Sequence, residues 1–182
     1  MRRTDQTLLE QMQLSDAEIA RRMSLLSLND ESLSQLASHR LLIELRIEEI
    51  VGAFYQAQTE IDEISLLIGD ADTLRRLRDA QRHYVLDLFG GIYDAEYVNN
   101  RLRIGMVHKR IGVEPKLYLS AVRTLKEIIC QTLRDEINDE TVLVQTLDTL
   151  DKLIYFDTTL VFDTYIDSLI GEIQAAKRRT EI

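Results

Sequence analysis

Apolar residues recur at intervals of three and four along most of the 182-residue chain. This is the spacing of the buried face of an α-helix. The chain holds only seven glycines and one proline, so few turns and long helices are expected. The pattern therefore predicts an all-α fold.

Helix start and stop residues divide this pattern into segments. A first helix is expected to open with a capping box at Ser15-Asp-Ala-Glu18. A second stretch runs from about residue 30 to 58, as two helices that meet near residues 40–44. Further helices are expected over residues 70–89, from 94 to Gly112, over 115–136 and over 140–178.

The apolar stripe over residues 30–58 widens in its middle, as expected where a helix becomes buried on several sides. Its members are Leu36, Leu41, Leu42, Leu45, Ile47, Ile50, Val51 and Phe54. The last helix would span roughly 60 Å at about 1.5 Å per residue, with a broad apolar surface along it. The core of one ordinary domain cannot cover such a surface, so we expect a homodimer that forms through the last two helices.

Composition narrows the possible functions. Hydrophobic residues make up 45% of the chain and charged residues 29%, which fits one ordinary domain. The net charge of −9 would repel phosphate backbones and anionic lipids, so neither nucleic acid nor a membrane is an expected partner. The single cysteine, Cys130, excludes an internal disulfide.

Targeting signals and catalytic motifs are also missing from the sequence. No apolar run approaches the roughly 20 residues of a membrane span, and the N-terminus lacks a signal peptide, so a cytoplasmic location is expected. The sequence shows no glycine-rich phosphate loop, nucleophile motif or paired catalytic carboxylates. We therefore expect no enzymatic activity from this chain.

One histidine stands out because it lies on the apolar face of a helix. That face is formed by Ile104, Val107, His108 and Ile111. A buried neutral imidazole can bind iron, and Gly105 would let a flat cofactor approach the backbone. The alternative is a core histidine with no ligand, which is the commoner use of such a position.

Tyr55 invites a similar pair of interpretations. It follows Val51 by four residues and so continues the inward face of its helix. A buried hydroxyl needs a hydrogen-bond partner, and a backbone carbonyl of the core would be the ordinary one. The other interpretation is a hydroxyl that faces a ligand pocket.

The segment from Arg103 to Tyr118, RIGMVHKRIGVEPKLY, closely resembles the proximal segment of globin-coupled sensors. These are the haem-binding sensory globins of bacterial aerotaxis transducers and diguanylate cyclases. The resemblance extends from about Leu41 to Leu125. It implies a globin-like sensor fold over residues 30–178, an extra N-terminal helix within residues 1–29, and a tail or linker at residues 179–182.

The resemblance also implies the proximal side of a haem site. His108 corresponds to the proximal ligand of the haem b iron, with Ile104, Val107 and Ile111 on the same wall. Tyr118 matches a tyrosine that hydrogen-bonds to the segment carrying the proximal histidine. The tryptophan often found just before that tyrosine is Leu117 here.

On the distal side, the resemblance assigns Phe54 and Tyr55 to an aromatic pair whose tyrosine donates a hydrogen bond to the bound gas. Leu77 and Ala80 match positions that restrict access to that gas. Some relatives carry a threonine where this chain has Ala80, so no second donor is expected from this position.

The predicted function is a haem-based sensor of O₂, or of CO or NO. It would signal through a helical dimer to a C-terminal output domain such as a diguanylate cyclase. The alternative is a cofactor-free globin-like interaction module, in which His108 and Tyr55 are only polar residues of the core.

Overall fold

The computed structural model describes residues 5–180, which fold into nine helices and contain no strand. The predicted all-α fold is therefore confirmed. The helices are α1 (Leu8–Gln11), α2 (Asp16–Leu25), α3 (Asp30–Ala37), α4 (Arg40–Thr59), α5 (Asp62–Ile68), α6 (Ala71–Leu88), α7 (Ala95–Ile111), α8 (Pro115–Glu136) and α9 (Glu140–Thr180).

Side-chain caps set the start of most of these helices. Asp70 accepts a hydrogen bond from the Thr73 amide and opens α6, and Asp94 does the same for α7 through Tyr97. Helix α7 ends at Gly112, whose φ of 86° suits a residue without a Cβ atom. These boundaries agree with the predicted ones.

The N-terminus of α2 is simpler than the predicted capping box. Ser15 accepts a hydrogen bond from the Glu18 amide, as expected. The Glu18 carboxylate, however, pairs with Arg22 one turn later, at 3.0 Å. A reciprocal capping box is found instead at α1, between Thr7 and Glu10. The sequence pattern missed both α1 and α5, because helices of four and seven residues show too few periodic positions.

Two leucines assigned to the apolar stripe of α4 are in fact on its outer face. Leu41 is 67% exposed and Leu45 is 77% exposed, whereas Ile43 is fully buried. A step of two residues from Ile43 turns by about 200° around the helix, which directs both leucines to the opposite side. The buried face continues through Ile50 and Val51.

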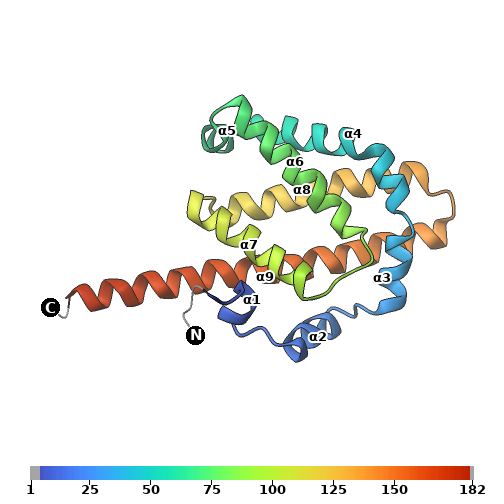
Figure 1. The fold of residues 1–182 in the computed structure, drawn as a ribbon. Coiled ribbons are helices and arrows are strands. Elements are labelled where there is room, and N and C mark those ends of the chain that lie inside the picture. The colour runs from blue at the N-terminus through green and yellow to red at the C-terminus, as the bar shows by residue number, and fades with distance from the viewer. Residues whose placement is uncertain (1–4, 181–182) are drawn as a thin grey trace.

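The helices form two packed groups that enclose one core (Figure 1). Helix α4 packs against α6 and α8, and α7 packs along the middle of α9. The N-terminal residues join this core, because Leu14, Ile19 and Leu28 are buried in it. The division at residues 29 and 30 stays a prediction, and residues 1–4 and 181–182 lie outside the described part.

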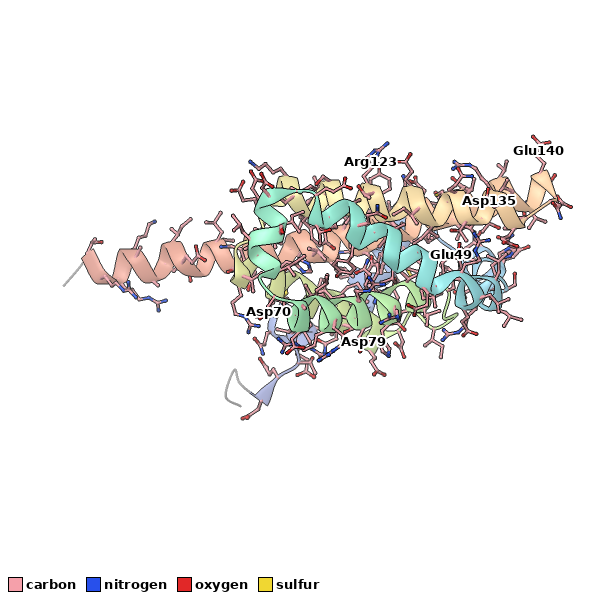
Figure 2. All side chains as sticks on the ribbon, turned by 90° about the horizontal axis from the view of Figure 1, so that it is seen from above. Glu49, Asp70, Asp79, Arg123, Asp135 and Glu140 are labelled. Atoms are coloured by element: carbon pink, nitrogen blue, oxygen red, sulfur yellow. The ribbon has the colours of Figure 1, made fainter. Side chains whose placement is uncertain are left out.

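The C-terminal end of α9 projects beyond the other helices (Figure 2). It exposes four large apolar side chains, each about half exposed: Ile166, Leu169, Ile170 and Ile173. Charged side chains such as Glu49 and Asp79 project from the surface of the other helices (Figure 2). In the described part of the chain, no helix combines the length and apolar character needed to cross a membrane.

Candidate functional site

A largely apolar cavity of about 220 Å³ lies between α4, α5, α6, α7 and α8, and Ile154 of α9 also lines it. Eight of the nine predicted site residues line it: Phe54, Tyr55, Leu77, Ala80, Ile104, His108, Ile111 and Tyr118. The ninth, Val107, does not belong to this lining and is 37% exposed. It precedes His108 by one residue, and the resulting turn of about 100° carries it toward the outer surface of α7.

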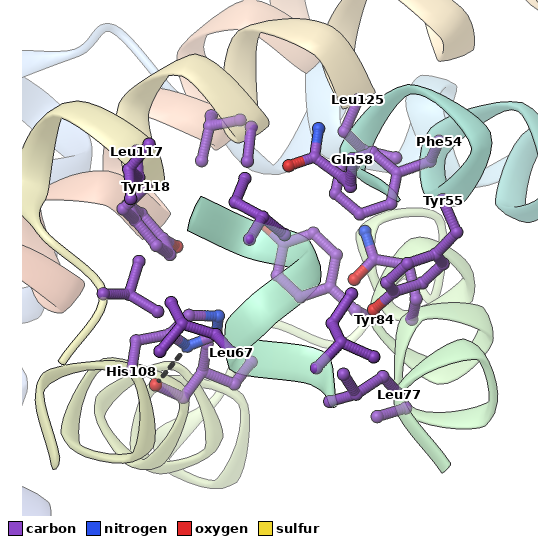
Figure 3. Close-up of a pocket in the computed structure, with 18 of the residues that line it drawn as sticks. Phe54, Tyr55, Gln58, Leu67, Leu77, Tyr84, His108, Leu117, Tyr118 and Leu125 are labelled. Atoms are coloured by element: carbon purple, nitrogen blue, oxygen red, sulfur yellow. Dashed lines mark hydrogen bonds between the residues drawn. The ribbon is translucent and has the colours of Figure 1, made fainter. Parts of the chain in front are cut away.

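The hydrogen bond of His108 determines which ring nitrogen is available to a ligand. Its Nδ1 lies 2.8 Å from the carbonyl oxygen of Ile104 (Figure 3). A carbonyl can only accept a hydrogen bond, so Nδ1 carries the proton and Nε2 keeps its lone pair. Metal-binding histidines are commonly held in this way, with the second nitrogen bonded to the protein.

Burial keeps this imidazole uncharged. It lowers the pKa of His108 below the ordinary value of 6.5, against a smaller upward effect of the bond to Ile104. A neutral imidazole is the form that binds a metal. His108 therefore presents a neutral ring with a free nitrogen in a cavity of mostly apolar residues.

Tyr118 does not make the bond that the resemblance implied. Its ring packs edge-on against His108, with the ring centroids 5.3 Å apart. The hydrogen bond to the segment after His108 comes from Tyr165 of α9, whose hydroxyl donates to the carbonyl of Val113 at 2.6 Å. Tyr118 thus restrains the His108 ring by packing, and Tyr165 ties this segment to α9.

Tyr55 lies across the cavity from His108 (Figure 3). Its ring packs edge-on against Phe54 at a centroid distance of 5.0 Å. Burial raises the pKa of Tyr55 to about 12, so its hydroxyl stays protonated and able to donate. Among residues 5–180 this hydroxyl has no hydrogen-bond partner, unlike the ordinary core tyrosine considered above.

Helix α6 supplies Leu77 and Ala80 to the same space. Neither side chain can donate a hydrogen bond. Two amides that were not among the predicted site residues also line the cavity, Gln58 of α4 and Gln81 of α6. Gln58 follows Tyr55 by three residues, and this spacing was a signal that both share one face.

Gly105 does not serve a cofactor, as the sequence had suggested. A Cβ atom on Gly105 would lie 2.1 Å from the Thr164 hydroxyl oxygen and 3.0 Å from two backbone atoms of Val161. Gly105 therefore allows α7 to approach α9 closely. A glycine is needed here because this side of α7 packs directly against α9.

A buried charged cluster adjoins the cavity. Arg101 of α7 is fully buried, and its Nε donates to the Asp157 carboxylate of α9 at 3.0 Å. Tyr84 and Tyr97 also donate to Asp157, at 3.0 and 2.7 Å, and their rings sandwich the Arg101 guanidinium. Burial alone would lower the pKa of Arg101, but the adjacent Asp157 charge outweighs it and the net direction is upward.

This cluster connects the cavity to α9, because Tyr84 both lines the cavity and binds Asp157. Neither Tyr84 nor Arg101 was among the predicted site residues. The terminal nitrogens of Arg101 have no hydrogen-bond partner within residues 5–180, although Nη1 lies 3.7 Å from the Asp87 carboxylate.

The donor set suits a haem group better than a metal ion held by several side chains. Within the described residues no group of three or more histidine, cysteine, aspartate or glutamate side chains could hold a metal ion. A haem iron needs one axial imidazole, which His108 offers, and an apolar space for the macrocycle.

Comparisons with known proteins agree with this geometry. Residues 15–170 match the model of the protoglobin family. The chain is 31% identical over 171 residues to the heme-based aerotactic transducer HemAT of Halobacterium salinarum, covering 88% of this chain and 35% of that protein.

The fold is similar to that of the globin domain of a Geobacter sulfurreducens globin-coupled sensor. The TM-score is 0.76 with 21% identity, covering 80% of this chain and 96% of that domain. The globin-like fold and the resemblance to globin-coupled sensors are thereby confirmed, and the chain belongs to the protoglobin family.

Proposed function

We propose that this chain is a haem-based gas-sensor domain in which His108 binds the haem b iron through Nε2. The observation that carries the proposal is the pairing of two groups across one cavity. The Nδ1 of His108 is bonded to the Ile104 carbonyl, and Tyr55 lines the cavity with a hydroxyl that has no partner among residues 5–180. The similarity to a heme-based aerotactic transducer supports the same function.

Ferrous haem supplies reversible binding of diatomic gases and shifts negative charge onto the outer atom of O₂ more than onto that of CO. The residues that line the cavity would then change the dissociation rate of each gas to a different extent. The Tyr55 hydroxyl can donate a hydrogen bond in a largely apolar cavity, where such bonds are stronger than in water. O₂ is therefore the expected ligand. CO and NO would gain less from this hydrogen bond.

Signalling is proposed to run through α8 and α9 in a homodimer. The exposed apolar side chains near the end of α9 support this, because a surface helix rarely shows four within eight residues without a partner. The chain spans 35% of the length of HemAT, so an output domain such as a diguanylate cyclase or a transducer module is part of the proposal. We also propose a cytoplasmic location and no catalysis by this domain itself.

The absorption spectrum of the protein reconstituted with haem tests the axial ligand. His108→Ala should lose haem or hold it weakly, because only solvent would remain on that side of the iron. His83→Ala is the matched control, since His83 is exposed and its Nδ1 bonds to the Asp79 carbonyl at the surface.

A His108→Ala variant that keeps the full Soret band and the same ferrous spectrum would contradict the assignment. A wild-type protein that takes up no haem would favour the cofactor-free interaction module.

A further inference from the structure

Gln58 places an amide inside the cavity, and the function described so far gives it no task. Its side chain is only 3% exposed, and it lines the cavity with Phe54 and Tyr55. The three residues share one face of α4, at intervals of three and four. Figure 3 shows the Gln58 amide beside Phe54 and Leu125, directed into the cavity.

This amide has no hydrogen-bond partner within residues 5–180. The contrast is Gln35 of α3, whose amide donates to the Thr146 hydroxyl at 2.9 Å. Polar side chains that are buried almost always have a partner, because removing them from water without one is costly. The Gln58 amide faces the cavity without a protein partner, so it is available to a ligand there that has a polar atom to bind.

Gln81 is the other amide of the lining, but it is only half-buried. Water can satisfy it from the surface, so its position requires no ligand. Gln58, by contrast, is only 3% exposed, and its amide faces the cavity. It also lies on the same helix as the distal tyrosine, one turn further along.

We propose that Gln58 is a second specificity-determining residue of the gas site, and that its Nε2 donates a hydrogen bond to the bound gas together with the Tyr55 hydroxyl. This inference rests on the proposed function. It replaces the expectation that the tyrosine alone discriminates between gases, which followed from the absence of a donor at Ala80. Two donors on one helix wall would favour a ligand that accumulates negative charge over one that does not.

Gln58→Leu tests this, because leucine nearly matches the volume and removes both polar atoms. Stopped-flow dissociation of O₂ from the haem-loaded protein should become roughly five- to tenfold faster, the effect of losing one net hydrogen bond. Dissociation of CO should change much less. Gln56→Leu is the matched control, since Gln56 lies on α4 but is exposed and outside the cavity lining, and its rates should equal those of the wild type.

The haem-free protein supplies a second readout. Gln58→Leu should raise the midpoint of urea unfolding, because the amide makes no protein hydrogen bond that leucine would lose and leucine adds apolar surface to the core, and Gln56→Leu should leave the midpoint unchanged. A purely structural role of Gln58 would instead lower the midpoint of Gln58→Leu and leave O₂ dissociation as it was, which overturns the inference.

The Tyr55→Phe variant separates the two proposals. If it speeds O₂ release while Gln58→Leu matches Gln56→Leu, then Gln58 is no ligand contact and the proposed function stands. If the wild-type protein binds no haem, both proposals fail together.

Discussion

A Cβ atom on Gly105 of α7 would lie only 2.1 Å from the hydroxyl oxygen of Thr164 on α9. No side chain larger than hydrogen fits between the two helices at this point. The contact lies one turn before His108 on the same helix, so α9 is pressed against the segment that carries the proposed iron ligand. A second contact between α7 and α9 lies one turn earlier, where Arg101 binds the Asp157 carboxylate.

Gly105→Ala should therefore destabilise the protein by about 1–3 kcal/mol, the usual cost of an overpacked core position. The Thr164 hydroxyl can rotate away, but the Val161 backbone, at 3.0 Å from the added atom, cannot. Gly171→Ala on exposed α9 is the control and should gain up to about 1 kcal/mol through helix propensity. Urea unfolding of the haem-free proteins measures both, and equal stabilities of Gly105→Ala and the wild type would show that the helices separate easily.

Asp157→Asn should cost about 3–5 kcal/mol of unfolding free energy, because it leaves the buried Arg101 charge without its counterion. The comparison is Asp148→Asn, which breaks an exposed ion pair with Lys152 on the same helix and should cost less than about 1 kcal/mol. Chemical denaturation gives both values. A small effect at Asp157 would mean that water already reaches the Arg101 guanidinium.

The depressed pKa of His108 predicts how stability depends on pH. Unfolded His108 has the ordinary pKa of 6.5 and the folded residue a lower one, so the unfolded state binds more protons between the two values. Stability of the haem-free protein should therefore fall as the pH drops below 6.5, and level off below the folded pKa. Urea unfolding above and below pH 6.5 tests this.

His108→Gln should weaken this pH dependence. His39→Gln is a useful comparison, because burial also lowers the pKa of His39, although this residue is more exposed to solvent. The prediction is contradicted if His108→Gln keeps the pH dependence of stability seen in the wild type and His39→Gln loses it. The pH dependence would then come from His39.

Tyr55→Phe keeps the aromatic ring and removes only the hydroxyl. O₂ dissociation should accelerate by a factor of roughly 5 to 150, which corresponds to about 1–3 kcal/mol, and CO dissociation should change far less. Stopped-flow rates for both gases provide the measurement. Equal changes for the two gases would mean that the hydroxyl does not face the bound ligand.

The exposed end of α9 predicts the oligomeric state. Sedimentation at micromolar concentrations should show a dimer for the wild type and a folded monomer for Ile170→Lys, because a charge cannot be buried in an apolar interface without a partner. Ile92→Lys is the control, since Ile92 is 70% exposed but belongs to the loop between α6 and α7 and not to the last two helices. A monomeric wild type would contradict this part of the proposal.

The helices that position the site were predictable because their signals are local. Asp70, Asp94, Gly112 and Pro115 act on backbone groups within one turn, and the spacing around His108 and Tyr55 reports which faces point inward. Leu41 and Leu45 were wrongly assigned to the buried face of α4. With apolar residues on several sides of α4, periodicity alone does not identify the buried face.

The features that were missed depend on residues far apart in the sequence. Arg101 looks like a surface residue until Asp157, 56 positions later, is placed against it. Gly105 is similarly ambiguous, because the sequence does not reveal that Thr164 is its neighbour. Gln58 carried a local signal in its spacing from Tyr55, yet its importance depends on the absence of a partner, which only the structure displays for the described residues.

The close contact at Gly105 and Thr164 lies well before the end of α9. Sixteen residues separate Thr164 from Thr180, a helical arm of roughly 24 Å at about 1.5 Å per residue. The far part of this arm extends past the other helices (Figure 2). A tilt of α9 by only about 5° at the contact would displace its end by about 2 Å, since the displacement grows with the length of the arm. Any tilt of α9 that starts at this contact, one turn from His108, would therefore be largest at the C-terminal end of the helix.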